Sequence, residues 1–310
     1  MARAGSVLRD PAARRLTAGD LEAVFLPGFG MLGASLRLRG EELLGRIEDL
    51  DTAAAKGSTA GIPLLYPWAN RLAGLRYRAA GLEVVLDPAS PILHLDDRGL
   101  PIHGVPWAQL AWEATAAAPD ALRARLDWTA SALLAVFPFR HRVELDVGLR
   151  PDGLTVATTV TALGDGPVPV SFGFHPYFSL TGMDRARWRL LLPSLRRLAL
   201  DPRGIPTGEE ADAPPVDAEL DDRAWDDGFA LHEPGRAALA LAGAGRRITV
   251  ELLSGYRFAQ VFAPRDKPFV ALEPMTAPAN ALVSGSGLST AEPGVPFRAS
   301  FRIRVEDFTG

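Results

Sequence analysis

The chain has 310 residues and a mass of 33.1 kDa, with 47% hydrophobic and 23% charged residues, as in an ordinary globular protein. Its 37 acidic and 33 basic residues give a net charge of −4, and no long run of Lys or Arg supplies the positive field that holds a nucleic acid. The sequence contains no cysteine, which excludes disulfides, thiol nucleophiles and cysteine-bound metal centres.

The N-terminal segment is basic but lacks the apolar stretch of a signal peptide, and the chain has no stretch of ~18 predominantly apolar residues. We therefore expect a cytoplasmic protein that has neither a nucleic acid nor a membrane as its partner.

Hydrophobic and polar residues alternate in several segments along the chain, which is typical of half-buried strands. These segments are residues 121–128, 142–149, 154–161, 247–252 and 297–305. The turn sequence Pro151-Asp152-Gly153 separates two of them and predicts a hairpin over residues 142–162. With 30 glycines and 26 prolines for turns, the pattern predicts an all-β fold, a sandwich or barrel in which residues 1–310 form a single domain.

The stretch 201–222 is rich in proline and acidic residues and is the one candidate for a linker. We interpret it as a long surface loop rather than a domain boundary, because strand patterns of the same character resume on both sides.

Three residues stand out as candidates for acid–base chemistry. His175 lies among four aromatic residues in VSFGFHPYFSL, an apolar setting that shifts the pKa of an imidazole. His103 lies in LPIHGVPW, where Pro and Gly disrupt a regular strand. Glu273 ends an apolar run and precedes a proline. Each also has a structural interpretation, as a core His, a turn or a strand end that reaches solvent.

The other histidines have more ordinary surroundings. His141 begins a regular strand, His232 lies in a turn, and His94 fits a half-buried structural position. Two His and one Glu could form a metal triad, but no H-x-H, H-x-E or HExxH pattern supports one. Asn70 and Arg71 follow a rigid Pro-containing segment, and an Arg in such a place suits recognition of hydroxyl or carboxylate oxygens.

Six short motifs, taken together and in order, resemble those of the aldose 1-epimerase (mutarotase) family. They are GIPLLYPWANRL, LPIHGVPW, FGFHPYF, IPTGE, WDDGF and LEPMTAP. The resemblance covers residues from about 20 to 305 and implies a single large antiparallel β-supersandwich of the galactose mutarotase type.

The resemblance also implies a reaction, the interconversion of the α and β anomers of a free aldohexose. It makes Glu273 the base at O1 and His175 the acid at the ring oxygen, with His103 as a second imidazole nearby. It assigns sugar hydroxyls to Asn70, Arg71 and Asp226. The family often has Asp-His where this chain has Asp226-Asp227, so either aspartate could contact the sugar.

Ring opening takes a proton from O1 and gives one to O5, so one base and one acid suffice, without a metal or an organic cofactor. At unperturbed pKa values of about 4.3 and 6.5, an ionised Glu and a protonated His coexist around pH 5 to 6. A raised His pKa beside the Glu would widen that window. The expected partner is a small-molecule aldose, and the expected assembly is a monomer or homodimer.

Two alternatives remain open. A hexose-6-phosphate 1-epimerase would share the acid and base but needs cations for phosphate, and Arg71 is the only cation that a motif places. A non-catalytic carbohydrate-binding protein would need hydroxyl partners, but not an acid and a base together.

Overall fold

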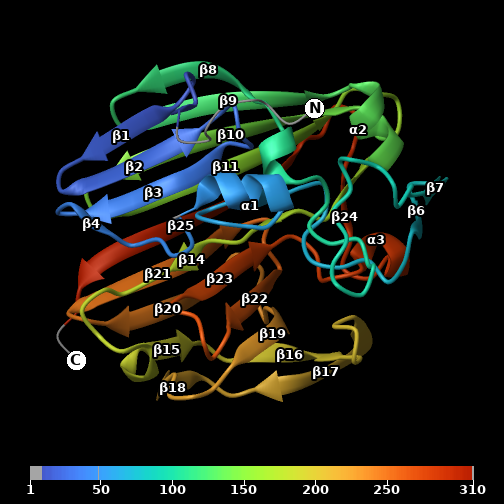
Figure 1. The fold of residues 1–310 in the computed structure, drawn as a ribbon. Coiled ribbons are helices and arrows are strands. Elements are labelled where there is room, and N and C mark those ends of the chain that lie inside the picture. Colours follow the sequence, from blue (N-terminus) through green and yellow to red (C-terminus); the bar gives the residue numbers. More distant parts are fainter. Residues whose placement is uncertain (1–8, 48, 309–310) are drawn as a thin grey trace.

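The computed structural model describes residues 9–47 and 49–308, and antiparallel strands dominate this part of the chain (Figure 1). The larger of the two main sheets has nine strands. From edge to edge they are β18 (Val216–Glu219), β15 (Arg189–Leu192), β20 (Ala237–Gly243), β21 (Arg246–Ser254), β25 (Phe297–Asp307), β11 (Gly153–Ala162), β10 (His141–Arg150), β9 (Ala121–Trp128) and β8 (Glu113–Ala118).

The second main sheet has eight strands and carries the candidate site. In order they are β17 (Pro206–Ala213), β16 (Leu195–Leu200), β19 (Trp225–Ala230), β22 (Phe258–Ala263), β23 (Val270–Met275), β13 (Gly173–Phe174) and β5 (Leu64–Leu65), and β14 (Tyr177–Phe178) also pairs with β23. Segments from the first and last quarters of the chain therefore lie in one sheet.

Smaller elements complete the fold. One sheet has four strands, β1 (Arg14–Ala18), β2 (Leu21–Leu26), β3 (Leu32–Leu38) and β4 (Glu41–Glu42). Two-stranded ribbons join β6 (Arg76–Ala79) to β7 (Leu82–Val85) and β12 (Val168–Val170) to β24 (Ser289–Ala291). The helices are short: α1 (Leu50–Lys56), α2 (Ser131–Val136), α3 (Ala281–Ser284) and the 3₁₀ turns η2 (Trp107–Gln109) and η3 (Arg185–Arg187).

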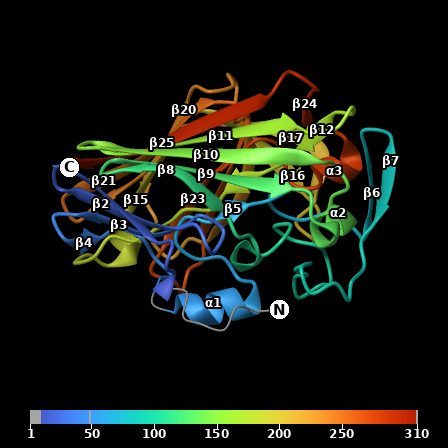
Figure 2. The ribbon, with the colours of Figure 1, turned by 90° about the horizontal axis from the view of Figure 1, so that it is seen from above.

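Seen from above, β25, β11, β10 and β9 form one layer, and β2, β3 and α1 lie to one side of it (Figure 2). A continuous hydrophobic cluster from Leu16 to Val305 fills the space between the layers. Along β10, the residues Val143, Leu145 and Val147 are buried and alternate with partly exposed polar residues. The period-two pattern thus marks the inner face of a sheet, and the predicted all-β antiparallel sandwich and the hairpin of residues 142–162 are confirmed.

The prediction of a long loop over residues 201–222 is wrong. β17 pairs with β16 at the edge of the eight-stranded sheet, and β18 pairs with β15 at the edge of the nine-stranded sheet. Nearly every residue of β17 is at least partly exposed, so this strand has no buried face to produce alternation. Its acidic side chains are typical of exposed edge strands, where charge prevents pairing with other chains.

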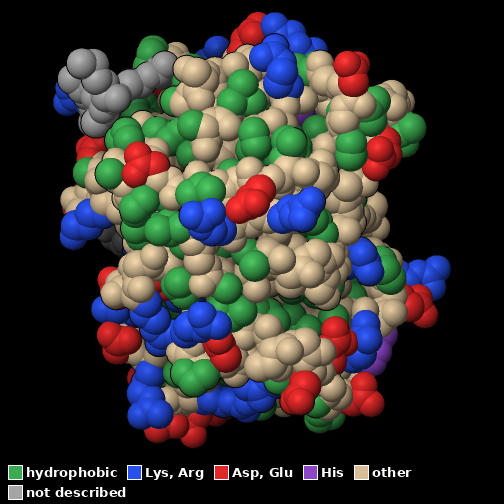
Figure 3. Space-filling model, turned by 90° about the vertical axis from the view of Figure 1, so that its right-hand side faces the viewer, with side chains coloured by type: hydrophobic (Ala, Val, Ile, Leu, Met, Phe, Trp, Pro, Cys, Tyr) green, Lys and Arg blue, Asp and Glu red, His purple; other side chains and the backbone are tan. Residues whose placement is uncertain are grey.

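Arg, Lys, Asp and Glu side chains are interspersed on the face shown in Figure 3 rather than gathered by sign. Among the described residues, no helix is long and apolar enough to cross a membrane.

The segments around Tyr66 and Gly104 lie side by side next to the candidate site. Tyr66 forms a parallel bridge with Gly104, and the backbone N–H of Val105 donates to the carbonyl of Tyr66 at 2.9 Å. Gly104 has φ +65°, and a Cβ at this position would lie 2.3 Å from the Tyr66 carbonyl oxygen. Only glycine fits there, and it holds the neighbouring His103 in place.

We expect Gly104→Ala to lower the free energy of unfolding by about 3 kcal/mol or more, because the left-handed backbone and the clash both cost energy. Urea denaturation measures the loss. Gly81→Ala is the matched control, since Gly81 has φ +80° with no atom within 4 Å of an added Cβ. It should cost about 1 kcal/mol. Equal losses in the two variants would contradict the close approach.

Candidate active site

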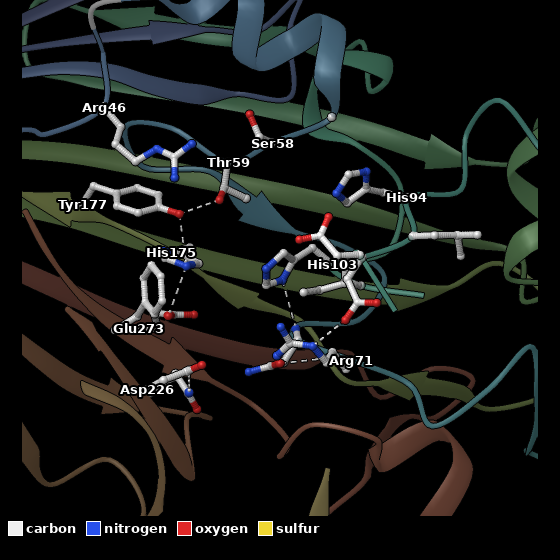
Figure 4. A pocket seen from close by; sticks show the side chains of 18 residues that line it. Arg46, Ser58, Thr59, Arg71, His94, His103, His175, Tyr177, Asp226 and Glu273 are labelled. Carbon is white, nitrogen blue, oxygen red and sulfur yellow. Dashed lines mark hydrogen bonds and ion pairs between the residues drawn. The ribbon is translucent and has the colours of Figure 1, made fainter. Parts of the chain in front are cut away.

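A polar cavity of about 310 Å³ opens beside the central strands of the eight-stranded sheet (Figure 4). All six residues predicted for the site line this one cavity: Asn70, Arg71, His103, His175, Asp226 and Glu273. They come from positions up to about 200 residues apart in the sequence, so only the folded sheet brings them together.

Strand register sets the relation between His175 and Glu273. Gly173 pairs with Met275 and Tyr177 pairs with Ala271, so His175 lies across from Glu273. Proline follows each of the two residues in the sequence and lacks a backbone N–H, which interrupts the ladder between β13 and β14. The interruption leaves the two side chains at a gap in the sheet, facing the cavity.

The acid–base candidates are in direct contact. His175 Nε2 lies 3.2 Å from Glu273 Oε1, and the two residues are only 5% and 2% exposed. The Tyr177 ring stacks on the His175 ring at 4.2 Å, and its hydroxyl lies 3.2 Å from His175 Nε2 and 2.5 Å from Thr59 Oγ1. His175 Nδ1 and Glu273 Oε2 have no hydrogen-bond partner among the described residues. One nitrogen and one oxygen are therefore free to bond a ligand.

Burial shifts the pKa values of this pair in opposite directions. Burial, with the Asp226 carboxylate, raises the pKa of Glu273 well above its usual value. Burial, with His103 and Arg46, lowers the pKa of His175 well below its usual value. Both shifts disfavour the charged forms, so the pair holds a single proton, preferentially on the carboxyl group. The rise in the His175 pKa that a neighbouring carboxylate would cause is not found, because burial is the largest influence and lowers this pKa.

His103 is fixed as a neutral imidazole. Its backbone N–H donates to the Asn70 carbonyl at 3.0 Å, and its Nδ1 accepts from the Asn70 backbone N–H at 3.1 Å. An Nδ1 that accepts carries no proton, so the proton of the neutral ring is on Nε2. Burial, with Arg71 and His94, lowers the pKa of His103 to about 3. His103 is therefore a hydrogen-bond donor at neutral pH.

The hydroxyl-binding candidates lie around the remaining wall. Arg71 Nε donates to Asp96 Oδ2 at 2.8 Å, which fixes the guanidinium at the cavity edge. Gln260 Nε2 donates to Asp226 Oδ1 at 2.7 Å, and burial raises the pKa of Asp226. Asp227 forms an ion pair with Arg197 and does not line the cavity. Of the two adjacent aspartates, Asp226 is the one that faces the cavity.

Other lining residues were not found from the sequence. Arg46, Thr59 and Gln260 line the cavity, but each lies in a segment with no recognisable motif. His94 also lines it, although its sequence surroundings favoured a structural position. The register of β22 and β23, which pairs Gln260 with Glu273, could have identified Gln260 once the strands were aligned.

The two remaining histidines lie elsewhere. His141 is buried in the core, where Nε2 contacts the Tyr66 hydroxyl at 2.5 Å and Nδ1 contacts the Phe139 carbonyl at 2.5 Å. His232 is exposed near Ser194. Among residues 9–47 and 49–308, no group of three or more His, Asp or Glu side chains is arranged to hold a metal ion.

Known proteins share this fold. The chain is 27% identical over 267 residues to the uncharacterized protein YihR of Escherichia coli strain K12, and the match covers 77% of each chain. A putative aldose 1-epimerase from E. coli K12 superposes with a TM-score of 0.77 at 22% identity, covering 96% of this chain and 99% of that one. The Slr1438 protein from Synechocystis sp. PCC 6803 has a TM-score of 0.80 at 23% identity, with 99% and 100% covered. These two structural matches establish the fold.

The family assignment rests on the sequence as a whole. A family model described as aldose 1-epimerase matches residues 16–304, nearly the entire chain. With the antiparallel sandwich and the six motif residues around one cavity, this match shows that the chain belongs to the aldose 1-epimerase family.

Proposed function

We propose that this protein is an isomerase that interconverts the α and β anomers of a free aldohexose by acid–base ring opening and closure. The contact between His175 and Glu273 carries the proposal, because one buried acid and one buried base face the same polar cavity. Family membership supports the reaction class.

The reaction moves two protons and breaks one bond. The reaction starts from the form of the pair in which the single proton lies on His175. Glu273 as a carboxylate then accepts the O1 proton while the C1–O5 bond breaks, and protonated His175 gives its proton to O5. The product is an open aldehyde beside a neutral Glu273 and a neutral His175. Rotation about C1–C2 presents the other carbonyl face, and the two proton transfers then run in reverse to close the ring.

Burial favours this direction of proton transfer. The charged pair is the form that desolvation penalises, and ring opening converts it to the neutral pair. His103 and the side chains of Arg71 and Asp226 would hold the sugar by its oxygens, which keeps O1 and O5 at the acid and the base.

Replacement of the base tests the mechanism. We expect Glu273→Gln to lower kcat by about 10²–10⁴-fold while sugar binding persists, because the amide cannot accept the O1 proton. His175→Asn should cost a comparable factor. Polarimetry of α-glucose and α-galactose against the spontaneous rate measures turnover, and it also separates an enzyme from a protein that only binds sugar.

His232→Asn is the control, since this exposed residue lies outside the cavity. Retention of more than about a tenth of the wild-type kcat in Glu273→Gln would remove this residue from the role of base.

The pH profile follows from the single proton of the pair. Activity falls at low pH when the pair gains a second proton, and the lowered His175 pKa delays this gain. Activity falls at high pH when the pair loses its proton, and the raised Glu273 pKa delays this loss. We therefore expect a bell-shaped kcat/KM profile whose acidic limb lies below the ordinary pKa of His, ~6.5, and whose alkaline limb lies above the ordinary pKa of Glu, ~4.3. An acidic limb above ~6.5 would contradict the lowered pKa of His175.

Metal dependence is tested separately. The proposed proton transfers use only side chains of this chain, so we expect chelator treatment and dialysis to leave the mutarotation rate unchanged. A loss of activity that zinc or iron restores would require another mechanism.

A further inference from the structure

One cation in the cavity takes no part in the mechanism above. Arg46 lines the cavity, and its guanidinium lies 5.2 Å from the ring centre of Tyr177 and 5.7 Å from that of Phe269. No carboxylate within the described ranges forms an ion pair with it, whereas Arg71 forms an ion pair with Asp96. An unneutralised guanidinium in a ligand cavity is a ready partner for an anion.

Backbone hydrogen bonds hold the segment that carries Arg46 next to the strand that follows His175. Leu44 forms a bridge with Phe178, and the Gly45 N–H donates to the Tyr177 carbonyl at 3.0 Å. Arg46 then takes a left-handed φ of +57°, which is uncommon for a residue with a side chain. Its position is thus tied to the strand that follows His175.

The order of groups in the cavity fits a substituted sugar. The Tyr177 ring lies between Arg46 and His175, and Glu273 and Asp226 continue the row beyond His175 (Figure 4). In the proposed reaction His175 gives its proton to O5. C5 is bonded to O5 and carries C6, so a substituent at C6 extends from His175 past Tyr177 towards Arg46. The Ser58 and Thr59 side chains line the same end.

We infer that Arg46 binds a monoanionic group at C6, so that the substrate class is a hexuronate, an aldose whose C6 is a carboxylate. This inference rests on the proposed mutarotase function and names its substrate. A planar guanidinium matches one carboxylate in a bidentate pair. A phosphate dianion fits less well, because one Arg balances only part of its charge and Asp97 and Asp226 line the same cavity.

The test compares sugars that differ only at C6. We expect kcat/KM for glucuronate and galacturonate to exceed that for glucose and galactose by about tenfold or more, the contribution of a charge-assisted hydrogen bond. Anomer exchange is measured by ¹H NMR at pH 7 and matched ionic strength, with glucose 6-phosphate as a third arm.

Substitutions of Arg46 test whether its guanidinium causes the preference for uronates. Arg46→Gln should reduce the uronate-to-hexose ratio of kcat/KM by about tenfold or more, and Arg46→Lys should retain part of it. The ratio is taken within one variant, so a partial loss of folded protein cancels. Arg257→Gln is the matched control, because Arg257 also contacts an aromatic ring but lies outside the cavity. Its guanidinium lies 5.9 Å from the ring centre of Phe258. This substitution should leave the ratio unchanged.

The outcomes separate this inference from the proposed function. Turnover of neutral hexoses with no uronate preference, or a preference that Arg46→Gln leaves intact, overturns the inference alone. A tenfold preference for glucose 6-phosphate over the uronates overturns the inference that Arg46 binds a monoanionic group. If no aldose is turned over, the proposed function fails, and calorimetry with methyl glucoside and methyl glucuronoside, which cannot open, decides the inference. Equal affinities for the two glycosides would then overturn it.

Discussion

The burial of a carboxyl group against an imidazole is the constraint on which the rest of the site depends. Glu273 and His175 are almost completely removed from water, and this burial destabilises the charged form of each side chain. Their 3.2 Å contact lets a single proton serve both groups, which keeps the pair neutral overall. A site of this kind costs folding free energy, so the surrounding sheet must hold it rigidly.

The rigidity comes from strands on both sides of Glu273. β22 pairs with β23 on one side, and β13 and β14 pair with it on the other. Stacking of Tyr177 on the His175 ring and the edge contact of Phe262 fix the imidazole plane without supplying a charge. The apolar environment that shifts the pKa values and the framework that positions the atoms are therefore the same set of residues.

The sequence predicted the fold class well, because a half-buried strand reveals itself by alternation wherever one face is buried, as in β10 and β25. It failed for β17, which pairs through its backbone but has no buried face. The six motif residues were found because their motifs are contiguous stretches of sequence. Arg46 was missed because its place depends on the bridge between Leu44 and Phe178, a contact that no local pattern encodes. The direction of the His175 pKa shift could not be predicted, because the motifs identify Glu273 as a neighbour of His175 but do not reveal how deeply the two residues are buried.

The two imidazoles in the cavity show how similar groups take different chemical roles. Their rings are 5.8 Å apart, yet His103 is held by the Asn70 backbone at Nδ1, beside the positive charge of Arg71. Protonation of His103 would break that hydrogen bond and place two cations together, so its proton stays on Nε2. His175 has a carboxyl group as its neighbour and a free Nδ1. Of the two imidazoles, therefore, only that of His175 can exchange a proton in the proposed reaction. His103 instead offers the same hydrogen bond to the sugar in both anomers and in the open aldehyde.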